Sequence, residues 1–396
     1  MHKPKLWTKD FLIDSITNFF VYLVYYLLIL TITVYATDNF QASPSEAGLA
    51  SGIFIVGALF ARIFAGRSIE RVGRKKMLYL GLTFFLITTL LYFEINSLLF
   101  LFVIRFLSGV GFGISSTATG TIAASIIPNE RRGEGTSYYA MSTTLALAVG
   151  PFLSILTTQH GSFNIIFALC VILLAVTFIA TFFLKVPEIQ LTKEQLESMQ
   201  EFKLTNFFEA KAFPISIISA LIGFSYSSIL CFLTSYTKEI NLLDAGSFFF
   251  MVFAGLVLIS RPLTGRWFDQ KGENFVMYPA FLLFAMGLVI MSQARQGSFL
   301  LLAGAFVGLG FGTFTSSAQA ISVKVSPRHR MGLATSTFFI FLDGGVGIGP
   351  FLLGLLVPLT GFRGLYVSMS VVVFACIFLY YFLHGRKAEH RKHLAT

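Results

Sequence analysis

Twelve apolar segments, each about as long as a bilayer is thick, dominate this chain of 396 residues. A helix needs about 20 mainly apolar residues to cross roughly 30 Å of hydrocarbon. Such segments lie near 11–36, 47–66, 77–95, 98–122, 135–157 and 162–184, and then near 213–236, 247–266, 277–294, 298–322, 333–358 and 362–384. Only 12% of the residues are charged and 55% are hydrophobic, too little polar surface for a soluble globule. The sequence predicts an all-α membrane protein with twelve transmembrane helices.

The basic residues predict which side of the membrane each loop faces. Nearly all of the 29 Lys and Arg residues lie in segments assigned to one side, and Arg62 and Arg261 are counted among them. Only Lys238, Arg295 and Arg363 fall on the other side. The positive-inside rule then places both termini in the cytoplasm. Because this asymmetry accounts for the net charge of +10, no nucleic-acid partner is expected.

The two sets of six segments repeat one another at a constant offset. Aligned pairs include GPFL at 150–153 and 349–352, GVGFG at 109–113 with GLGFG at 308–312, Arg62 with Arg261, and Gly73 with Gly272. Parallel repeats of this kind are typical of transporters. We expect two pseudo-symmetric six-helix bundles over 1–185 and 213–396, the second with a short basic tail. The polar segment 186–212 would join them as an amphipathic cytoplasmic helix, acting as a passive tether or as a regulatory element.

The glycine pairs of the repeats have a packing interpretation. Gly109 with Gly113, and Gly308 with Gly312, show the small-x-x-x-small spacing that lets membrane helices approach closely. A dinucleotide-binding loop would need a preceding strand and a soluble domain, and the sequence predicts neither. We therefore expect these glycines to lie at helix contacts.

The loop after the second segment carries a recognisable motif. GRSIERVGRKK at 66–76 resembles the G-x-L-x-D-R-x-G-R-K signature of the major facilitator superfamily, with Glu70 in place of the aspartate. Its second-half counterpart, GRWFDQKGEN at 265–274, keeps the acidic residue as Asp269. In that family the acidic residue contacts the N-terminus of the eleventh helix in the outward-open state, because a helix N-terminus attracts anions. The resemblance covers nearly the whole chain, and it implies a conformational switch that includes Gly66, Glu70, Arg71, Gly73, Arg74 and Asp269.

The fifth segment favours export over import. ALAVGPFLSI at 146–155 resembles the G-x-x-x-G-P-x-x-G-G pattern of family members that export by antiport. Gly150 and Pro151 match this pattern, while Ser154 and Ile155 depart from it. The resemblance adds Gly150 and Pro151 to the expected switch.

Three ionisable residues within the apolar segments are candidates for proton coupling. Asp343 lies about 16 Å into its helix, and desolvation there favours the protonated carboxyl, which suits a group that binds and releases protons. Its repeat mate is Thr144. Arg105, about 12 Å deep in a segment that resembles the family's fourth helix, would bind substrate or assist coupling. Asp14 starts a polar and aromatic stripe on the first segment. The alternatives are that Asp343 binds a cation or braces a glycine-rich bend, that Arg105 snorkels to the outer surface, and that Asp14 lies at the interface.

Aromatic residues form 16% of the chain, and the resemblance implies an aromatic cavity between the first, fourth, seventh and tenth helices, suited to bulky lipophilic or cationic substrates. Many aromatics of a membrane protein instead face lipid or form interfacial belts. The candidates for a substrate cavity are Asn18, Tyr22, Tyr25, Tyr26, Phe112, Phe224, Tyr226 and Phe311.

The sequence therefore predicts a multi-pass protein of the cell membrane, similar to the drug:proton antiporters. It would export small lipophilic or cationic compounds in exchange for protons by alternating access, as a monomer. The alternatives are a proton-coupled transporter of a sugar, an amino-acid-like compound or a metal chelator, and a membrane sensor that binds a ligand without moving it. We expect no enzymatic activity, no metal site and no cofactor besides the proton gradient.

Overall fold

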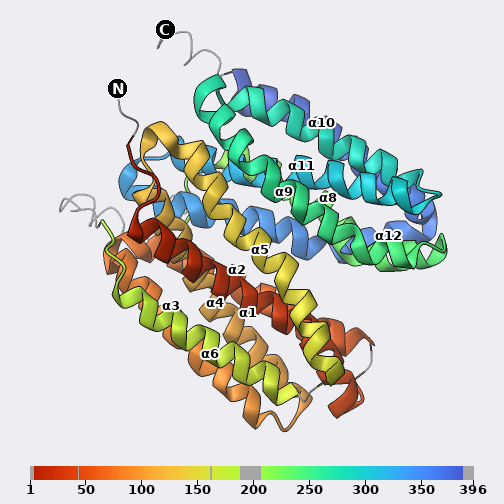
Figure 1. Ribbon diagram of the computed structural model, residues 1–396, viewed down its shortest axis with the longest axis horizontal. Helices are drawn as coiled ribbons and strands as arrows, with labels where there is room; N and C mark the ends of the chain where they lie inside the picture. Colours follow the sequence, from red (N-terminus) through yellow and green to blue (C-terminus); the bar gives the residue numbers. More distant parts are fainter. Residues whose placement is uncertain (1–3, 43, 161–162, 188–206, 387–396) are drawn as a thin grey trace.

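Long helices make up almost the whole of the computed structural model, which describes residues 4–42, 44–160, 163–187 and 207–386 (Figure 1). No strand occurs within these ranges. The helices are α1 (Lys9–Phe40), α2 (Pro44–Val72), α3 (Arg74–Leu90), η1 (Leu91–Glu94), α4 (Leu98–Ile126), η2 (Asn129–Arg131), α5 (Arg132–His160), α6 (Phe163–Phe182), α8 (Phe213–Glu239), α9 (Leu243–Lys271), α10 (Glu273–Ser292), α11 (Gly297–Lys324), η4 (Arg328–Arg330), α12 (Met331–Tyr380) and η5 (Tyr381–Gly385).

The predicted spans correspond to these helices, with one difference in the last pair. Within the described residues, 11 helical segments are long and apolar enough to cross a membrane, and α12 with η5 supplies two of them. The helix of 29 residues that forms α5 corresponds to the remaining predicted span, 135–157. The predicted eleventh and twelfth spans join in α12, and only Gly361, at φ +65°, departs from helical geometry between them. Glycine adopts this left-handed conformation without the steric cost that a Cβ would bring.

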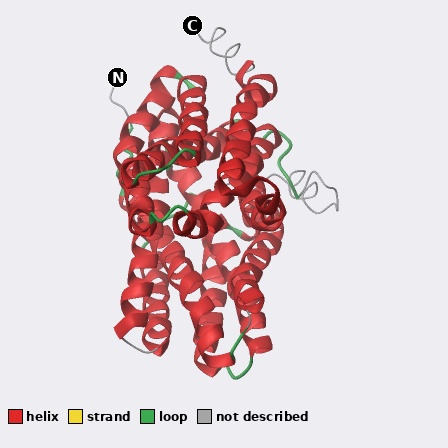
Figure 2. Ribbon diagram, turned by 90° about the vertical axis from the view of Figure 1, so that its right-hand side faces the viewer, coloured by secondary structure: helices red, strands yellow, loops and turns green. Residues whose placement is uncertain are grey.

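The helices form two bundles (Figure 1), and each bundle has its own apolar core. Figure 2 shows that the described residues of both bundles form helices joined by loops. One core comes from α1 to α6 and the other from α8 to α12. The bundles meet where α2 packs against α12 and α5 packs against α9. These two helix pairs are related by the sequence repeat, so the interface has the same pseudo-symmetry as the bundles. The exact domain limits stay a prediction, because most of the proposed linker, 188–206, lies outside the described residues.

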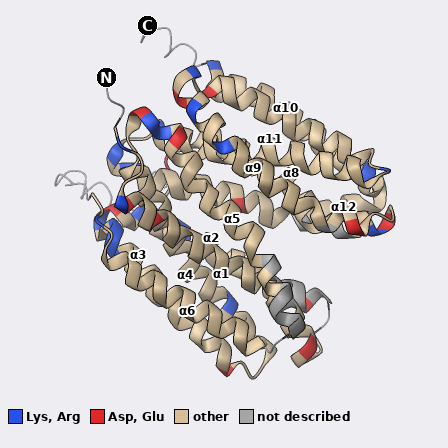
Figure 3. Ribbon diagram, viewed as in Figure 1, with Lys and Arg blue, Asp and Glu red and all other residues tan. Residues whose placement is uncertain are grey.

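Both termini lie at the same end of the helices, which we call the terminal face (Figure 1). At the opposite end the ribbons of the two halves diverge, and Lys and Arg gather mainly at the terminal face (Figure 3). This distribution agrees with the charge asymmetry in the sequence. That the terminal face lies in the cytoplasm stays a prediction.

Two of the arginines counted with the cytoplasmic loops lie deep within helices, far from the helix ends. Arg62 is fully buried in α2, about ten residues or 15 Å before its end, and Arg261 has the matching position in α9 with 4% exposure. The assignment was wrong because each helix continues past its apolar run to the glycine turn. Gly73 and Gly272, at φ +98° and +94°, end those helices at matched positions.

The glycine pairs of the repeats lie at close helix contacts, which confirms their packing interpretation. A Cβ at Gly109 would lie 2.0 Å from the carbonyl oxygen of Phe54 on α2, and one at Gly308 would lie 2.6 Å from that of Phe253 on α9. Gly113 and Gly312 make equally close contacts one turn further along. The α2–α4 and α9–α11 contacts therefore depend on the absence of side chains.

We expect Gly109→Leu to lower the free energy of unfolding by about 1–3 kcal/mol, because the backbone of α2 cannot move away without disturbing the first-half core. The thermal unfolding midpoint of the detergent-solubilised protein measures this effect. Gly255→Leu is the matched control, since a Cβ at Gly255 on α9 meets nothing within 4 Å. Equal midpoints for the two variants would contradict the packing argument.

Candidate functional site

A cavity of about 200 Å³ lies between the two halves and takes its lining from both. The first half contributes residues of α1, α2, α4 and α5, and the second half contributes residues of α8, α9, α11 and α12. Seven of the eight predicted cavity residues line it: Asn18, Tyr22, Tyr25, Tyr26, Phe112, Tyr226 and Phe311. The structure thus brings these seven to one place, and their contact with substrate stays a prediction.

Phe224 does not line the cavity. It lies two positions before Tyr226 on α8, hence about 200° around the helix. There it packs against the second-half core. The aromatic residues of a sequence stretch cannot all face the same side of a helix, and Tyr226 has the inward position.

Aromatic rings form two facing walls of the cavity. In the first half, Tyr25 stacks on Phe54 and on Phe112, with 5.1 Å between ring centroids in both pairs. In the second half, Tyr226 stacks on Phe311 at 3.8 Å with an interplanar angle of 12°. Rings held in this way offer flat apolar surfaces that can accept an apolar or aromatic group.

An ion pair connects the two halves beside these rings. Arg62 Nη1 of α2 donates to Asp343 Oδ2 of α12, and the Arg62 side chain is 1% exposed while that of Asp343 is 30% exposed toward the cavity. Arg62 also donates to Ser116 Oγ at 3.3 Å and packs over the Phe339 ring at 4.8 Å. Asp343 is therefore not the isolated desolvated carboxylate that the sequence suggested, because an arginine from the other half neutralises it.

The other two proton-coupling candidates lie away from the cavity lining. Arg105 donates through Nε to the carbonyl oxygen of Ala50 at 2.9 Å and packs over Phe54, with 4.5 Å from Cζ to the ring centroid. The Phe54 ring lies between Arg105 and the cavity. Snorkelling to the surface is excluded because Arg105 is fully buried. Asp14 is also fully buried, and neither of its carboxylate oxygens accepts a hydrogen bond within the described residues.

Asn18 connects three helices at the edge of the cavity. Its Nδ2 donates to Ser142 Oγ at 2.8 Å and to Thr143 Oγ1 at 3.1 Å, both on α5. Its Oδ1 accepts from Thr119 Oγ1 of α4 at 3.0 Å. With both ends of the amide occupied, Asn18 holds α1, α4 and α5 together beside the cavity.

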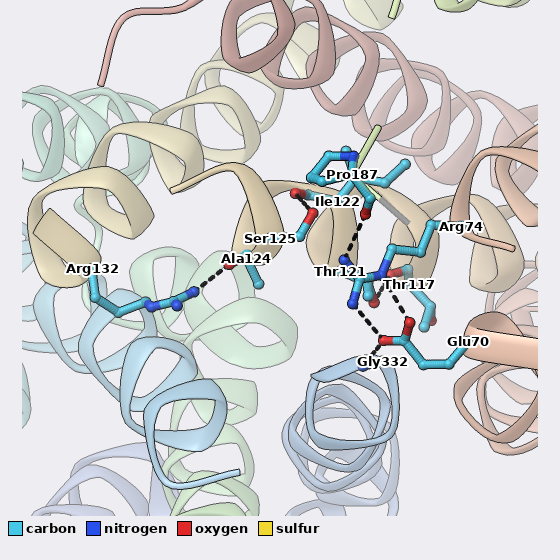
Figure 4. A network of polar contacts seen from close by, with 10 residues as sticks. All are labelled: Glu70, Arg74, Thr117, Thr121, Ile122, Ala124, Ser125, Arg132, Pro187 and Gly332. Atoms are coloured by element: carbon cyan, nitrogen blue, oxygen red, sulfur yellow. Dashed lines mark hydrogen bonds and ion pairs between the residues drawn. The ribbon is translucent and has the colours of Figure 1, made fainter. Parts of the chain in front are cut away.

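Two acidic side chains hold the halves together at the terminal face. Figure 4 shows Glu70 between Arg74, whose Nε and Nη2 donate to its two oxygens at 2.9 Å, and the N–H of Gly332, which donates to Oε1 at 3.3 Å. Gly332 starts α12, so this is the contact with the eleventh predicted span that the resemblance implies. At the repeat-related position, Asp269 accepts from the N–H groups of Gly133 at 2.7 Å and Glu134 at 2.9 Å, which start α5.

Glycines allow these contacts to be close. A Cβ at Gly66 would lie 2.2 Å from Ser336 Cβ, and one at Gly332 would lie 2.1 Å from Ile69 Cγ2. Gly133 and Gly265 make the repeat-related contacts between α5 and α9. Among the other predicted switch residues, Arg71 is exposed and Gly150 packs against Tyr26 on α1. The side chain of Pro151 lies outside the described residues.

Comparison with known families agrees with this architecture. A family model described as the Major Facilitator Superfamily matches residues 15–298 and 272–395, and so spans nearly the whole chain. The chain belongs to the major facilitator superfamily. It is therefore a transporter and not an enzyme.

Several members of the superfamily resemble the chain along most of its length. An uncharacterized MFS-type transporter of Methanocaldococcus jannaschii is 22% identical over 92% of this chain and 95% of its own. The staphylopine export protein of Staphylococcus aureus is 25% identical over 84% of this chain and 85% of its own. Among solved structures, the superfamily transporter FucP in the outward conformation superposes with a TM-score of 0.74 at 14% identity, over 96% of this chain and 99% of its own.

Sequence reasoning missed the cavity roles of Arg62 and Arg261 in this superfamily member. Arg62 pairs with Asp343, and Arg261 lines the cavity. The signal was present, because the repeat aligns the two arginines four residues before Gly66 and Gly265. Each helix continues beyond that glycine to Gly73 or Gly272, and this places both arginines well before the helix end.

Proposed function

We propose that this superfamily member is a proton-coupled secondary transporter that exports small lipophilic compounds across the cell membrane by alternating access. The observation that carries the proposal is the ion pair between Arg62 and Asp343, which joins the two halves at the wall of an aromatic cavity. In this proposal both termini lie in the cytoplasm, one chain is the transporting unit, and the proton gradient supplies the energy without a bound cofactor.

The ion pair can couple a proton to the movement of the halves. Asp343 lies about 18 Å into α12, so its charge is near the middle of a membrane roughly 30 Å thick. Protonation of its carboxyl removes the charge that holds Arg62, because a neutral acid attracts a guanidinium much less strongly. The two halves then lose one of their connections across the cavity. Deprotonation restores it, and the carboxylate and the guanidinium pull the halves together again.

The contacts between the halves support an outward-facing state. At the terminal face, Glu70 of α2 accepts a hydrogen bond from the N-terminus of α12, and Asp269 of α9 accepts one from the N-terminus of α5. These contacts close that face, while the halves diverge at the opposite end (Figure 1). If the terminal face is cytoplasmic, protons from outside reach Asp343 through the exposed part of its side chain. Opening the terminal face would require the N-termini of α12 and α5 to lose their hydrogen bonds to Glu70 and Asp269. Glu70, Arg74, Asp269 and their glycines therefore act as the switch.

The direction of transport rests on two observations. Gly150 and Pro151 match the antiport pattern, and a relative that is similar over most of its length is an export protein. The second candidate function is transport of one specific metabolite, such as an amino-acid-like compound or a metal chelator. The polar side chains of Thr315, Ser316 and Gln319 in the cavity lining favour this alternative over purely lipophilic substrates.

Inverted membrane vesicles test the proposal directly. With the vesicle interior made acidic, we expect lipophilic dyes from a panel to accumulate inside vesicles that contain the protein. A protonophore should abolish this accumulation, because it removes the gradient that drives exchange. Vesicles without the protein provide the background. If no dye or candidate metabolite accumulates under either gradient direction, the export proposal is wrong, and binding without accumulation would favour a membrane sensor.

A further inference from the structure

Arg261 is a buried cation in the cavity wall that the coupling mechanism does not use. It lies in α9, about ten residues or 15 Å before the end of the helix, and is 4% exposed. Its side chain belongs to the lining of the cavity. A charge at this depth is costly to bury, so its retention points to a ligand or a partner.

The protein itself satisfies Arg261 poorly. Its one hydrogen bond within the described residues runs from Nη1 to the carbonyl oxygen of Ser137 and is long, at 3.4 Å. Its Nε is buried and has no acceptor. No acidic side chain in the described part of the chain forms an ion pair with it. Donors of a fixed, planar guanidinium are thus available in the wall of the cavity.

The repeat provides an internal comparison for this arginine. Arg62 has the matching place in the first half and is neutralised by Asp343 of the second half. The residue that corresponds to Asp343 is Thr144, which also lines the cavity and carries no charge. Of the two repeat-related arginines, Arg62 therefore has a carboxylate partner, whereas Arg261 has none within the described residues.

We propose that Arg261 binds the anionic group of the substrate, a carboxylate or a group of similar geometry, while an apolar part of the substrate lies against Tyr226 and Phe311. The substrate carboxylate takes the place that an aspartate at 144 would occupy. This inference deepens the proposed function, on which it rests in treating the cavity as the substrate site. It assigns the substrate to the small amphipathic organic acids.

The charge balance of the cavity supports this assignment over a cationic substrate. Arg62 and Asp343 neutralise one another, so Arg261 leaves one positive charge in excess. A cationic compound would meet that charge in a cavity with many apolar and aromatic side chains in its lining, where repulsion between like charges is weakly screened. A carboxylate would instead form a charge-assisted and bidentate contact with the guanidinium. The sequence predicted lipophilic or cationic substrates. The assignment to organic acids keeps the lipophilic character and replaces the positive charge by a negative one.

Binding of 2-naphthoate and its neutral analogue 2-naphthamide tests the assignment. The two probes share a ring system that fits an aromatic wall and differ in the charge on one group. Equilibrium dialysis against the purified full-length protein in lipid nanodiscs measures both affinities, with empty nanodiscs as background. No proton gradient is present, so failure of the coupling proposal would not affect the result. Conversely, loss of the anion preference would leave proton-driven export of neutral compounds intact.

We expect the wild-type protein to bind 2-naphthoate about 10- to 100-fold more tightly than 2-naphthamide, as a hydrogen bond to a charged group implies. Arg261→Gln should remove this preference, and Arg261→Lys should keep part of it. Lys238→Gln is the control for net charge, because it loses the same charge at an exposed site beyond the cavity. Unchanged elution and unfolding midpoints in the absence of probe establish that each variant is folded.

Several results would overturn the assignment. These are equal affinity of the wild-type protein for the two probes, no binding of 2-naphthoate at millimolar concentration, or tighter binding of the cationic analogue 2-naphthylmethylamine. A preference for 2-naphthoate that persists in folded Arg261→Gln would place the anion elsewhere.

Discussion

Replacing Asp343 by Asn is expected to abolish proton-driven transport while the protein still inserts into the membrane. The amide cannot bind and release a proton in the physiological range, so the connection between the halves no longer responds to pH. A coupling free energy of about 1–3 kcal/mol corresponds to a factor of about 5–150 in the coupled equilibrium. We therefore expect proton-driven transport to decrease by a factor of about 150 or more. Accumulation in inverted vesicles with an acidic interior measures the loss.

Two further variants separate lost coupling from lost folding. Asp343→Asn leaves Arg62 buried without its partner, and breaking such a pair can itself cost about 3–5 kcal/mol. The double variant Arg62→Gln with Asp343→Asn keeps a hydrogen-bonding pair without charges and should fold while remaining uncoupled. Asp244→Asn changes an exposed carboxyl in the first turn of α9 and should transport normally. Wild-type uptake in folded Asp343→Asn would disprove the coupling role of this residue.

Introducing a leucine at Gly66 is expected to keep the terminal face from closing. A Cβ there would lie 2.2 Å from Ser336 Cβ, and neither atom can rotate away because each is attached directly to a backbone. An overlap of this kind costs about 1–3 kcal/mol in the closed arrangement and nothing when the halves are apart. The equilibrium between the two arrangements should therefore shift by a factor of about 5–150 toward opening at the terminal face.

Cysteine labelling measures this shift. In a variant that lacks Cys170, Cys231 and Cys376, a cysteine at Thr315 reports access to the cavity from each side of the membrane. Gly66→Leu should raise labelling from the terminal side by an impermeant thiol reagent and should lower it from the other side. Gly52→Leu on the same helix is the control, since a Cβ there meets nothing within 4 Å. Labelling equal to that of the control would mean that the Gly66 contact does not limit opening.

The helices, the repeat and the glycines at close helix contacts of this protein could all be predicted from its sequence. Apolar segments of bilayer length must form helices, because hydrocarbon offers no partners for backbone N–H and C=O groups. The repeat register aligned Gly73 with Gly272, which end equivalent helices in the structure, and it predicted that Gly109 and Gly308 lie at helix contacts. These are local properties, since each depends on the spacing of residues within one helix or one turn.

The contacts between polar groups of different helices could not be predicted in this way, because they depend on the tertiary packing. Arg62 and Asp343 lie far apart in the chain, and their pairing depends on how α2 and α12 are rotated against each other. The same rotations turn Tyr226 into the cavity and Phe224 away from it, and they place Phe54 between Arg105 and the cavity. Helical periodicity shows which residues share a face. Which face meets the other half depends on the packing of all twelve spans together. Because this is a long-range property, the sequence analysis counted Arg62 and Arg261 with the loop charges and did not place them at the cavity.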